Sequence, residues 1–180
     1  MLSLYLTLLE SDEDEDKFIL VYNKYKNLMF KEAYSYIKDY NLSEDCIQSA
    51  FMEIARCFDR IGEVESPETK AYVMTITRVC AFRIYNDERK NVTEPIEDFE
   101  LFPDSSAADD MIDKTEESLV TETVSDLPER YRDVLILRFA YDYDYEHMAR
   151  LLGISPSAVR KRVERAKKVL ARELTPEVVN

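Results

Sequence analysis

One stretch near the C-terminus has the clearest structural pattern of the chain: DYEHMARLLGISPSAVRKRVERAKKVL, residues 144–170. Asp144 suits the N-cap of a short helix over 145–152, because its carboxylate can accept a backbone N–H of the first turn. Gly153 supplies the left-handed residue at which helices commonly end. Ser155 and Pro156 suit the cap and the first position of a second helix. The stretch therefore predicts a helix-turn-helix.

Small and apolar side chains fall where these two helices would meet. Ala149, four residues before Gly153, permits a close crossing. A shared core is expected from Met148, Leu152, Ile154, Val159 and Val163.

The second helix, expected to run to about Glu173, presents a polar and basic outer face. Short polar groups lie at its N-terminal end and bases lie further along. In a DNA-reading helix the N-terminus approaches base edges while cations contact phosphates. We predict DNA contacts from Ser155, Ser157, Arg160, Lys161, Arg162, Arg165 and Lys168.

Charge is unevenly distributed along the chain. The net charge is −13, which alone would argue against nucleic acid. Residues 155–172 nevertheless hold seven Lys and Arg against Glu164 alone, whereas residues 91–125 hold 11 Asp and Glu against Lys114 alone. Charges further apart than a Debye length of ~8 Å are largely screened, so the local field decides phosphate contact.

Composition and periodicity predict an all-α fold of two small helical domains. Only 2 glycines occur in 180 residues, and 46% of residues are hydrophobic. Apolar side chains recur at three-four spacing from Phe18 to Ile37. Ser43 is expected to cap a second helix, whose inner face includes Phe51, and Ser66-Pro67 is expected to open a third.

We predict five segments from this pattern. Residues 1–16 form an N-terminal extension and residues 17–90 the first domain. Residues 91–118 form a flexible acidic linker, because they hold too few hydrophobes to offset the entropy of ordering. Residues 119–174 form the helix-turn-helix domain and residues 175–180 a tail.

Several classes of protein are excluded by what the sequence lacks. His147 is the only histidine, and Gly62 and Gly153 are ninety-one residues apart, so neither a nucleophile–base pair nor a phosphate loop is expected. Three cysteines without a CxxC motif predict buried thiols, and we expect no metal, no cofactor and no enzymatic activity. The apolar residues 1–9 are too short to cross a bilayer. We expect no signal peptide, no membrane insertion and a cytoplasmic location.

Two stretches of the last third, GISPSAVRKRVERAKKVL (153–170) and LPERYRDVLILRF (127–139), resemble bacterial sigma factors of the extracytoplasmic-function group. The resemblance implies that the helix-turn-helix reads the minus-thirty-five element of promoter DNA. Residues 43–51 are similar to the family's helix that docks on core RNA polymerase, which implies polymerase binding by Asp45, Gln48 and Phe51. Residues 71–90 look like the helix that melts and reads the minus-ten element. The basic residues implied there are Arg78, Arg83, Arg89 and Lys90.

The expected function is that of a sigma factor, which binds core RNA polymerase and directs promoter-specific transcription initiation. The resemblance also implies an anti-sigma factor as a partner. One alternative is a helix-turn-helix regulator that acts without polymerase. Another is a sigma-like inhibitor that binds polymerase, since Val79 and Arg83 stand where the family usually has an Asn and an Asp.

Overall fold

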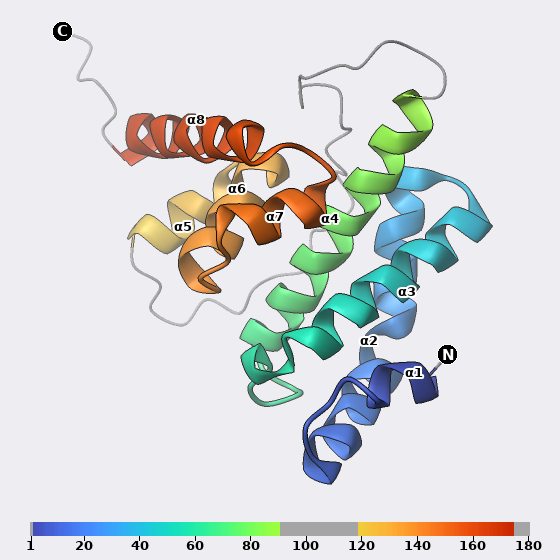
Figure 1. The fold of residues 1–180 in the computed structure, drawn as a ribbon. Coiled ribbons are helices and arrows are strands. Elements are labelled where there is room, and N and C mark those ends of the chain that lie inside the picture. The colour runs from blue at the N-terminus through green and yellow to red at the C-terminus, as the bar shows by residue number, and fades with distance from the viewer. Residues whose placement is uncertain (1, 91–118, 175–180) are drawn as a thin grey trace, which may run out of the picture. The chain divides into compact units, whose positions relative to one another are not determined.

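Helices form every regular element in the part of the chain that the structure describes (Figure 1). This computed structural model describes residues 2–90 and 119–174, without the side chains of residues 89, 90 and 119–122. The predicted all-α fold is confirmed across these ranges. The predicted linker, 91–118, and the predicted tail, 175–180, lie outside the described residues. The chain divides into two compact units, Met1–Glu97 and Asp98–Asn180.

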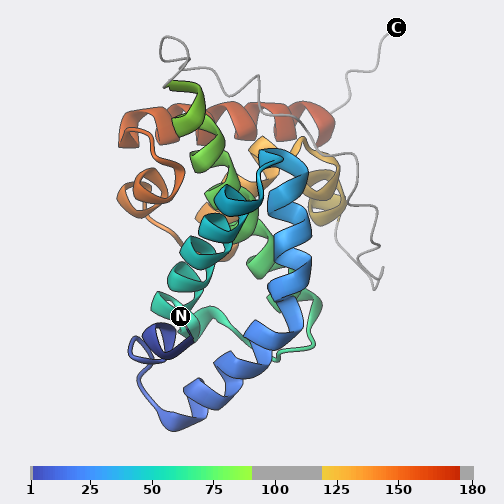
Figure 2. The same cartoon turned by 90° about the vertical axis from the view of Figure 1, so that its right-hand side faces the viewer.

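The N-terminal unit is built on three long helices, α2 (Asp12–Ile37), α3 (Tyr40–Arg56) and α4 (Pro67–Lys90). Each of the three packs against the other two, as the second view shows (Figure 2). A short helix, α1 (Leu2–Leu6), lies against α3, and a 3₁₀-helix over Phe58–Arg60 follows α3. No helix in the described ranges is long and apolar enough to cross a membrane.

The first two long helices begin at other residues than the sequence predicts. Ser11 caps α2, since its side chain accepts the Asp14 N–H at 3.2 Å, so the acidic block from Asp12 forms the first helical turn. Negative charge is favourable at the positive end of the helix dipole. The prediction that Ser43 caps the next helix is wrong. Asp39 is the cap, and it accepts the Leu42 N–H at 2.9 Å.

Aromatic side chains hold α1 onto the N-terminal unit. Tyr5 of α1 is 2% exposed, and its ring centroid lies 5.7 Å from that of Phe18 and 6.0 Å from that of Phe51. Tyr22 lies 4.7 Å from Phe51, and Phe58 lies 5.6 Å from Phe18. Ring pairs at such distances stabilise a core beyond the area that they bury. The predicted N-terminal extension therefore contributes Tyr5 to this core and residues 11–16 to the start of α2.

A buried ion pair links α4 to α2. Arg78 Nη1 lies 3.3 Å from Glu32 Oε1, and Arg78 Nη2 donates to Thr75 Oγ1 at 3.3 Å. Both charged side chains are about nine-tenths buried, at 10% and 9% exposure. A buried charge needs such a partner, because it has lost its hydration.

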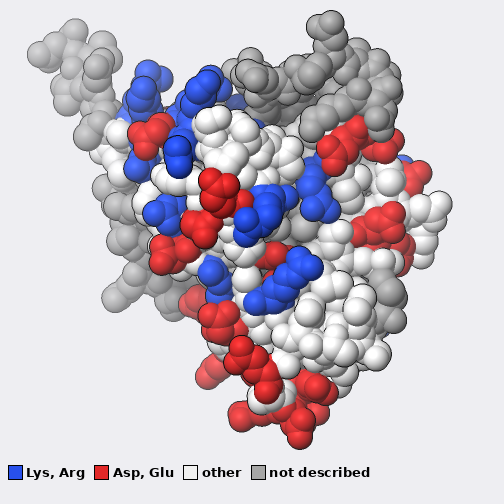
Figure 3. All heavy atoms as spheres, viewed as in Figure 1, with Lys and Arg blue, Asp and Glu red and all other residues white. Residues whose placement is uncertain are grey.

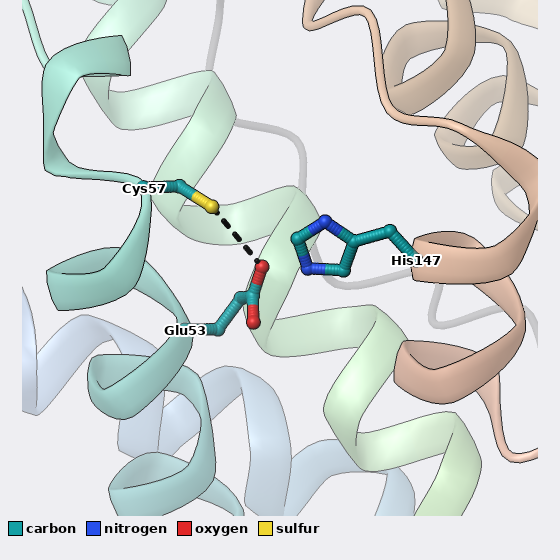
Figure 4. Close-up of side chains that lie close together, drawn as sticks. All are labelled: Glu53, Cys57 and His147. Carbon is teal, nitrogen blue, oxygen red and sulfur yellow. Dashed lines mark hydrogen bonds between the residues drawn. The ribbon is translucent and has the colours of Figure 1, made fainter.

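The three cysteines are buried free thiols, as the sequence predicts. Burial raises the pKa of the Cys46 and Cys80 thiols. Cys57 Sγ donates to the carboxylate of Glu53 one turn earlier on α3, at 3.5 Å (Figure 4). These thiols therefore behave as small core side chains.

The C-terminal unit contains α5 (Leu119–Asp126), α6 (Glu129–Leu135), α7 (Tyr145–Leu152) and α8 (Pro156–Leu174). Helix α8 packs against the other three. One turn of π-helix, Ile136–Ala140, follows α6. The Tyr141 N–H donates to Ile136 O at 3.1 Å, so this turn spans five residues. The sequence predicted neither α5 as a separate helix nor the π-helical turn.

Candidate nucleic-acid interface

The start of α7 is fixed by its predicted cap. Asp144 has an extended backbone, and its carboxylate accepts the His147 N–H at 2.7 Å. This hydrogen bond lowers the pKa of the Asp144 carboxyl below its ordinary value, because it favours the charged form. The Asp144 side chain is fully exposed, so water solvates both its charged and its neutral form.

The turn between α7 and α8 follows the predicted pattern. Gly153 has φ 65°, and the Ile154 N–H donates to Ala149 O at 3.2 Å. The left-handed conformation strains residues that carry a Cβ, which explains the glycine. Ser155 Oγ accepts the Ala158 N–H at 3.2 Å and lies 3.0 Å from Ser157 Oγ. The N-terminus of α8 is thereby fixed relative to α7.

Apolar side chains from both helices form the predicted shared core. Met148, Leu152, Val159 and Val163 are at most 1% exposed. Ile154 is half-buried, and Ala149 is buried with 6% exposure. This packing sets the direction in which the outer face of α8 points.

The outer face of α8 carries exposed polar and basic side chains. The structure places six of the seven predicted DNA-contacting residues on it: Ser155, Ser157, Arg160, Lys161, Arg165 and Lys168. In the view of Figure 3, several Lys and Arg side chains lie over α8, whereas acidic side chains gather where α2 begins. We call these six residues the basic face.

Arg162 is the exception, and the sequence prediction for it is corrected. Its side chain is 8% exposed and lies on the inner side of α8, between Val159 and Ala166 in the helical repeat. Burial lowers the pKa of its guanidinium to about 9, and the charge of Arg165 acts in the same direction. In this structure the Arg162 guanidinium is therefore not part of the exposed outer face of α8.

The residues predicted to bind polymerase are divided between surface and core. Asp45 is exposed and Gln48 is half-buried, and they lie one turn apart on the outer side of α3. Phe51 is fully buried among Tyr5, Phe18 and Tyr22. The direct contact predicted for Phe51 is therefore corrected to a supporting role beneath α3.

The basic residues predicted on α4 are also divided. Arg78 is buried in its pair with Glu32, so its guanidinium faces the core in this structure and not the surface. Arg83 is half-buried, and Val79 belongs to the core with 3% exposure. The side chains of Arg89 and Lys90, at the end of α4, lie outside the described residues.

Sequence reasoning missed one residue that touches the basic face. Tyr145, the first residue of α7, has its ring centroid 5.4 Å from the Arg160 guanidinium carbon and 5.2 Å from that of Arg138. Arg138 lies on the π-helical turn, which periodicity does not reveal. The sequence shows that Tyr145 follows the cap residue Asp144, but it does not show that Arg138 lies against the Tyr145 ring.

Comparison with known proteins gives a consistent result. The family described as sigma-70, region 4 matches residues 118–170, which include α7 and most of α8. RNA polymerase sigma factor SigV of Bacillus subtilis is 27% identical over 154 residues, which cover 85% of this chain and 88% of that protein. ECF RNA polymerase sigma factor SigX of the same organism is 26% identical over 170 residues, covering 89% of this chain and 84% of SigX.

One solved structure also aligns with the chain. It is the sigma factor RpoE in complex with the anti-sigma factor NepR from Bartonella quintana, at 20% identity and a TM-score of 0.37. The alignment covers 92% of this chain and 98% of that chain.

Proposed function

We propose that this chain is a bacterial RNA polymerase sigma factor of the extracytoplasmic-function group and that it reads upstream promoter DNA with the basic face of α8. The observation that carries the proposal is the arrangement of α7 and α8. Caps at Asp144 and Ser155 and a left-handed Gly153 present one polar and basic helix face to solvent. Such a helix fits the major groove, where polar side chains meet base edges and cations meet phosphates.

The N-terminal unit supplies the second contact in this proposal. Asp45 and Gln48, on the outer side of α3, would bind core RNA polymerase, while Phe51 keeps α3 in place from below. Arg83 on α4 would face the minus-ten element. Two separate contacts raise the effective concentration of each at its own site. Polymerase and promoter DNA would thus be held together by one chain.

Catalysis in this proposal belongs to the polymerase. The chain would supply recognition and positioning, without a cofactor or a metal of its own. It would work in the cytoplasm, where polymerase and DNA meet. An anti-sigma factor that covers the outer side of α3 or the basic face would switch it off.

Run-off transcription tests the function directly. Purified core polymerase would be incubated with genomic promoter fragments, with and without the full chain. We expect start sites that appear only when the chain is present. Binding to core polymerase without new start sites would instead indicate an inhibitor. Promoter binding by the free chain without any effect of polymerase would indicate a separate helix-turn-helix regulator.

The basic face makes a prediction about salt dependence. The variants Arg160→Ala and Lys161→Ala should each lower the slope of log K against log salt by about one unit, because each removes one phosphate contact. Arg162→Met is the matched control, since the buried Arg162 should leave the slope unchanged. Titrations of a labelled promoter fragment with the holoenzyme measure the slope. Equal slopes for all variants would show that the basic face is only a solvated surface.

A further inference from the structure

We propose that Tyr145 is a positioning residue that holds the Arg160 guanidinium in its DNA-facing orientation through a cation–π contact. The inference rests on the proposed function of the basic face, and it adds a residue outside α8 to the reading of DNA. Tyr145 belongs to α7 and would act through Arg160 without being a reading residue itself.

The geometry fits a cation–π contact. The guanidinium carbon of Arg160 lies 5.4 Å from the centroid of the Tyr145 ring. Guanidinium groups within about 6 Å of a ring centroid are attracted by the negative face of the ring, and the attraction at exposed sites is about 0.5–1 kcal/mol. Arg160 itself is exposed and Tyr145 is half-buried, so the contact lies at the edge of the basic face.

The ring is held in place from two sides. On one side, the backbone of Tyr145 begins α7 directly after the cap residue Asp144, whose side chain accepts the His147 N–H. Its neighbour Arg138 lies 5.2 Å from the same centroid. Arg138 Nη1 is fixed in turn by Asp142 Oδ1 at 3.3 Å and by the carbonyl of Tyr143 at 3.1 Å. The ring therefore offers Arg160 a defined surface.

In this arrangement the described residues leave the hydrogen-bond donors of Arg160 free. Within residues 2–90 and 119–174, no group accepts a hydrogen bond from its guanidinium. An ion pair would occupy these donors, whereas a ring restrains the side chain and leaves the N–H groups available for an outside acceptor. The Arg160 side chain would then already be restricted in the free chain, so it would lose less rotamer entropy on binding DNA.

Lys161 provides a comparison on the same face. It follows Arg160 directly and is also exposed, but no described ring lies against its ammonium group. If Tyr145 acts through Arg160, a change at Tyr145 must interact with a change at Arg160 and not with one at Lys161.

A double-mutant cycle tests this. The variants are Tyr145→Leu, Tyr145→Phe, Arg160→Gln and Lys161→Ala, singly and in pairs, each as full chain with core polymerase on a promoter fragment found by run-off transcription. We expect Tyr145→Leu to weaken promoter binding about two- to fivefold, the equivalent of the cation–π attraction. Tyr145→Phe should retain the wild-type affinity, because it keeps the ring. Tyr145→Leu should have no further effect beside Arg160→Gln, but its full effect beside Lys161→Ala.

A second measurement does not depend on DNA. In NMR spectra of the free chain, the ring current of Tyr145 should displace the side-chain proton signals of Arg160. Tyr145→Phe should retain the displacement and Tyr145→Leu should abolish it. If Tyr145→Leu fails to fold, as circular dichroism would show, the signals of the wild type and of Tyr145→Phe decide whether the contact exists.

The outcomes separate the inference from the proposed function. Without start sites from the wild-type chain, the proposed function fails. If the wild type is active, equal effects of Tyr145→Leu in the Arg160→Gln and Lys161→Ala backgrounds would overturn the inference. Loss of affinity in Tyr145→Phe would overturn it too, because it would assign the effect to the hydroxyl. Undisplaced Arg160 signals in the wild-type chain would show that the contact does not form.

Discussion

Arg78 shows how burial changes the role of a charged side chain. Its position on α4 predicted a contact with DNA, yet its guanidinium is turned inward to Glu32 and Thr75. Removing one partner of such a buried pair leaves a charge without compensation, which costs more than the pair itself contributes. The pair therefore links α4 to α2, and its loss should be felt as loss of stability.

Glu32→Ala is expected to lower the free energy of unfolding by about 3–5 kcal/mol. The matched control is Glu65→Ala. Glu65 also forms an ion pair, with Lys24, but its side chain is 82% exposed. Exposed pairs contribute at most about 1 kcal/mol, so the control should unfold nearly as the wild type does. Urea denaturation followed by circular dichroism measures both. Equal losses in the two variants would contradict the role of burial.

The corrections at single residues have a common physical cause. A contact assigned from residue type or from resemblance does not say which way the side chain points. Arg162 lies three residues after Val159 and directly before Val163, so helical spacing places it on the inner side of α8. Phe51 likewise lies on the predicted inner face of its helix. In both cases the periodicity agreed with the structure and the assigned contact did not.

At the scale of elements, the caps and the turn of α7 and α8 were predictable. Asp144 and Ser155 are the caps as predicted, and α7 and α8 begin where predicted. For α3 the sequence prediction named Ser43, although Asp39, four residues earlier, also carries a cap-type side chain. Lys38 takes a left-handed conformation with φ 59° and ends α2, which leaves Asp39 at the cap position. Ser43 Oγ then donates to Asp39 O at 2.6 Å within the helix.

The π-helical turn could not be predicted from periodicity. Apolar residues between Val134 and Phe139 fit an ordinary helix equally well. The wider turn appears only through its hydrogen bonds, from Tyr141 N to Ile136 O and from Tyr143 N to Leu137 O. It shifts the register of the chain before α7 and brings Arg138 to Tyr145. The local sequence therefore leaves this feature open.

The cap of α7 makes a prediction about acid. The pKa of Asp144 is lower in the folded chain, so the folded state favours the carboxylate. Its contribution is complete above the pKa of the unfolded chain, about 3.9, and disappears as the pH falls through the lower folded value. Asp144→Asn keeps a good cap without a titrating group. The stability of this variant should therefore fall less than that of the wild type below about pH 4.

Thermal unfolding from pH 7 to pH 2, followed by circular dichroism, measures this difference. Glu146→Gln is the control, since it also removes one carboxylate from the first turn of α7 but leaves the cap intact. If the stabilities of the wild-type chain and of Asp144→Asn fall in parallel with pH, the charge of Asp144 does not stabilise the start of α7.

At the scale of the molecule, each unit has a core of its own. The N-terminal core includes the aromatic cluster of Tyr5, Phe18, Tyr22, Phe51 and Phe58. The C-terminal core includes Leu137, Met148 and Val163. Length, composition and periodicity predicted two helical domains, but they did not predict that α1 completes the first core. Nothing in the sequence of α1 indicates which helix it packs against. It packs against α3, which lies some forty residues later in the chain.

Tyr5→Ala should destabilise the N-terminal unit by about 3–5 kcal/mol, the cost of deleting a large buried aromatic side chain and leaving a cavity. Leu4→Ala is the control, because Leu4 is 50% exposed on the same helix. Hydrogen exchange followed by mass spectrometry should show faster exchange in peptides from α2 and α3, and no change in those from α7 and α8. Faster exchange throughout the chain would contradict separate cores.

The docking of α1 on α3 also has a consequence for synthesis on the ribosome. Tyr5, Phe18 and Tyr22 emerge before Phe51, and chains grow at about 5–20 residues per second. Their rings therefore stay uncovered for seconds, on the order of the time needed to make and release α3. During that interval the nascent chain displays the kind of apolar surface that chaperones bind. The rate of synthesis would then set how long the newborn chain is exposed to aggregation.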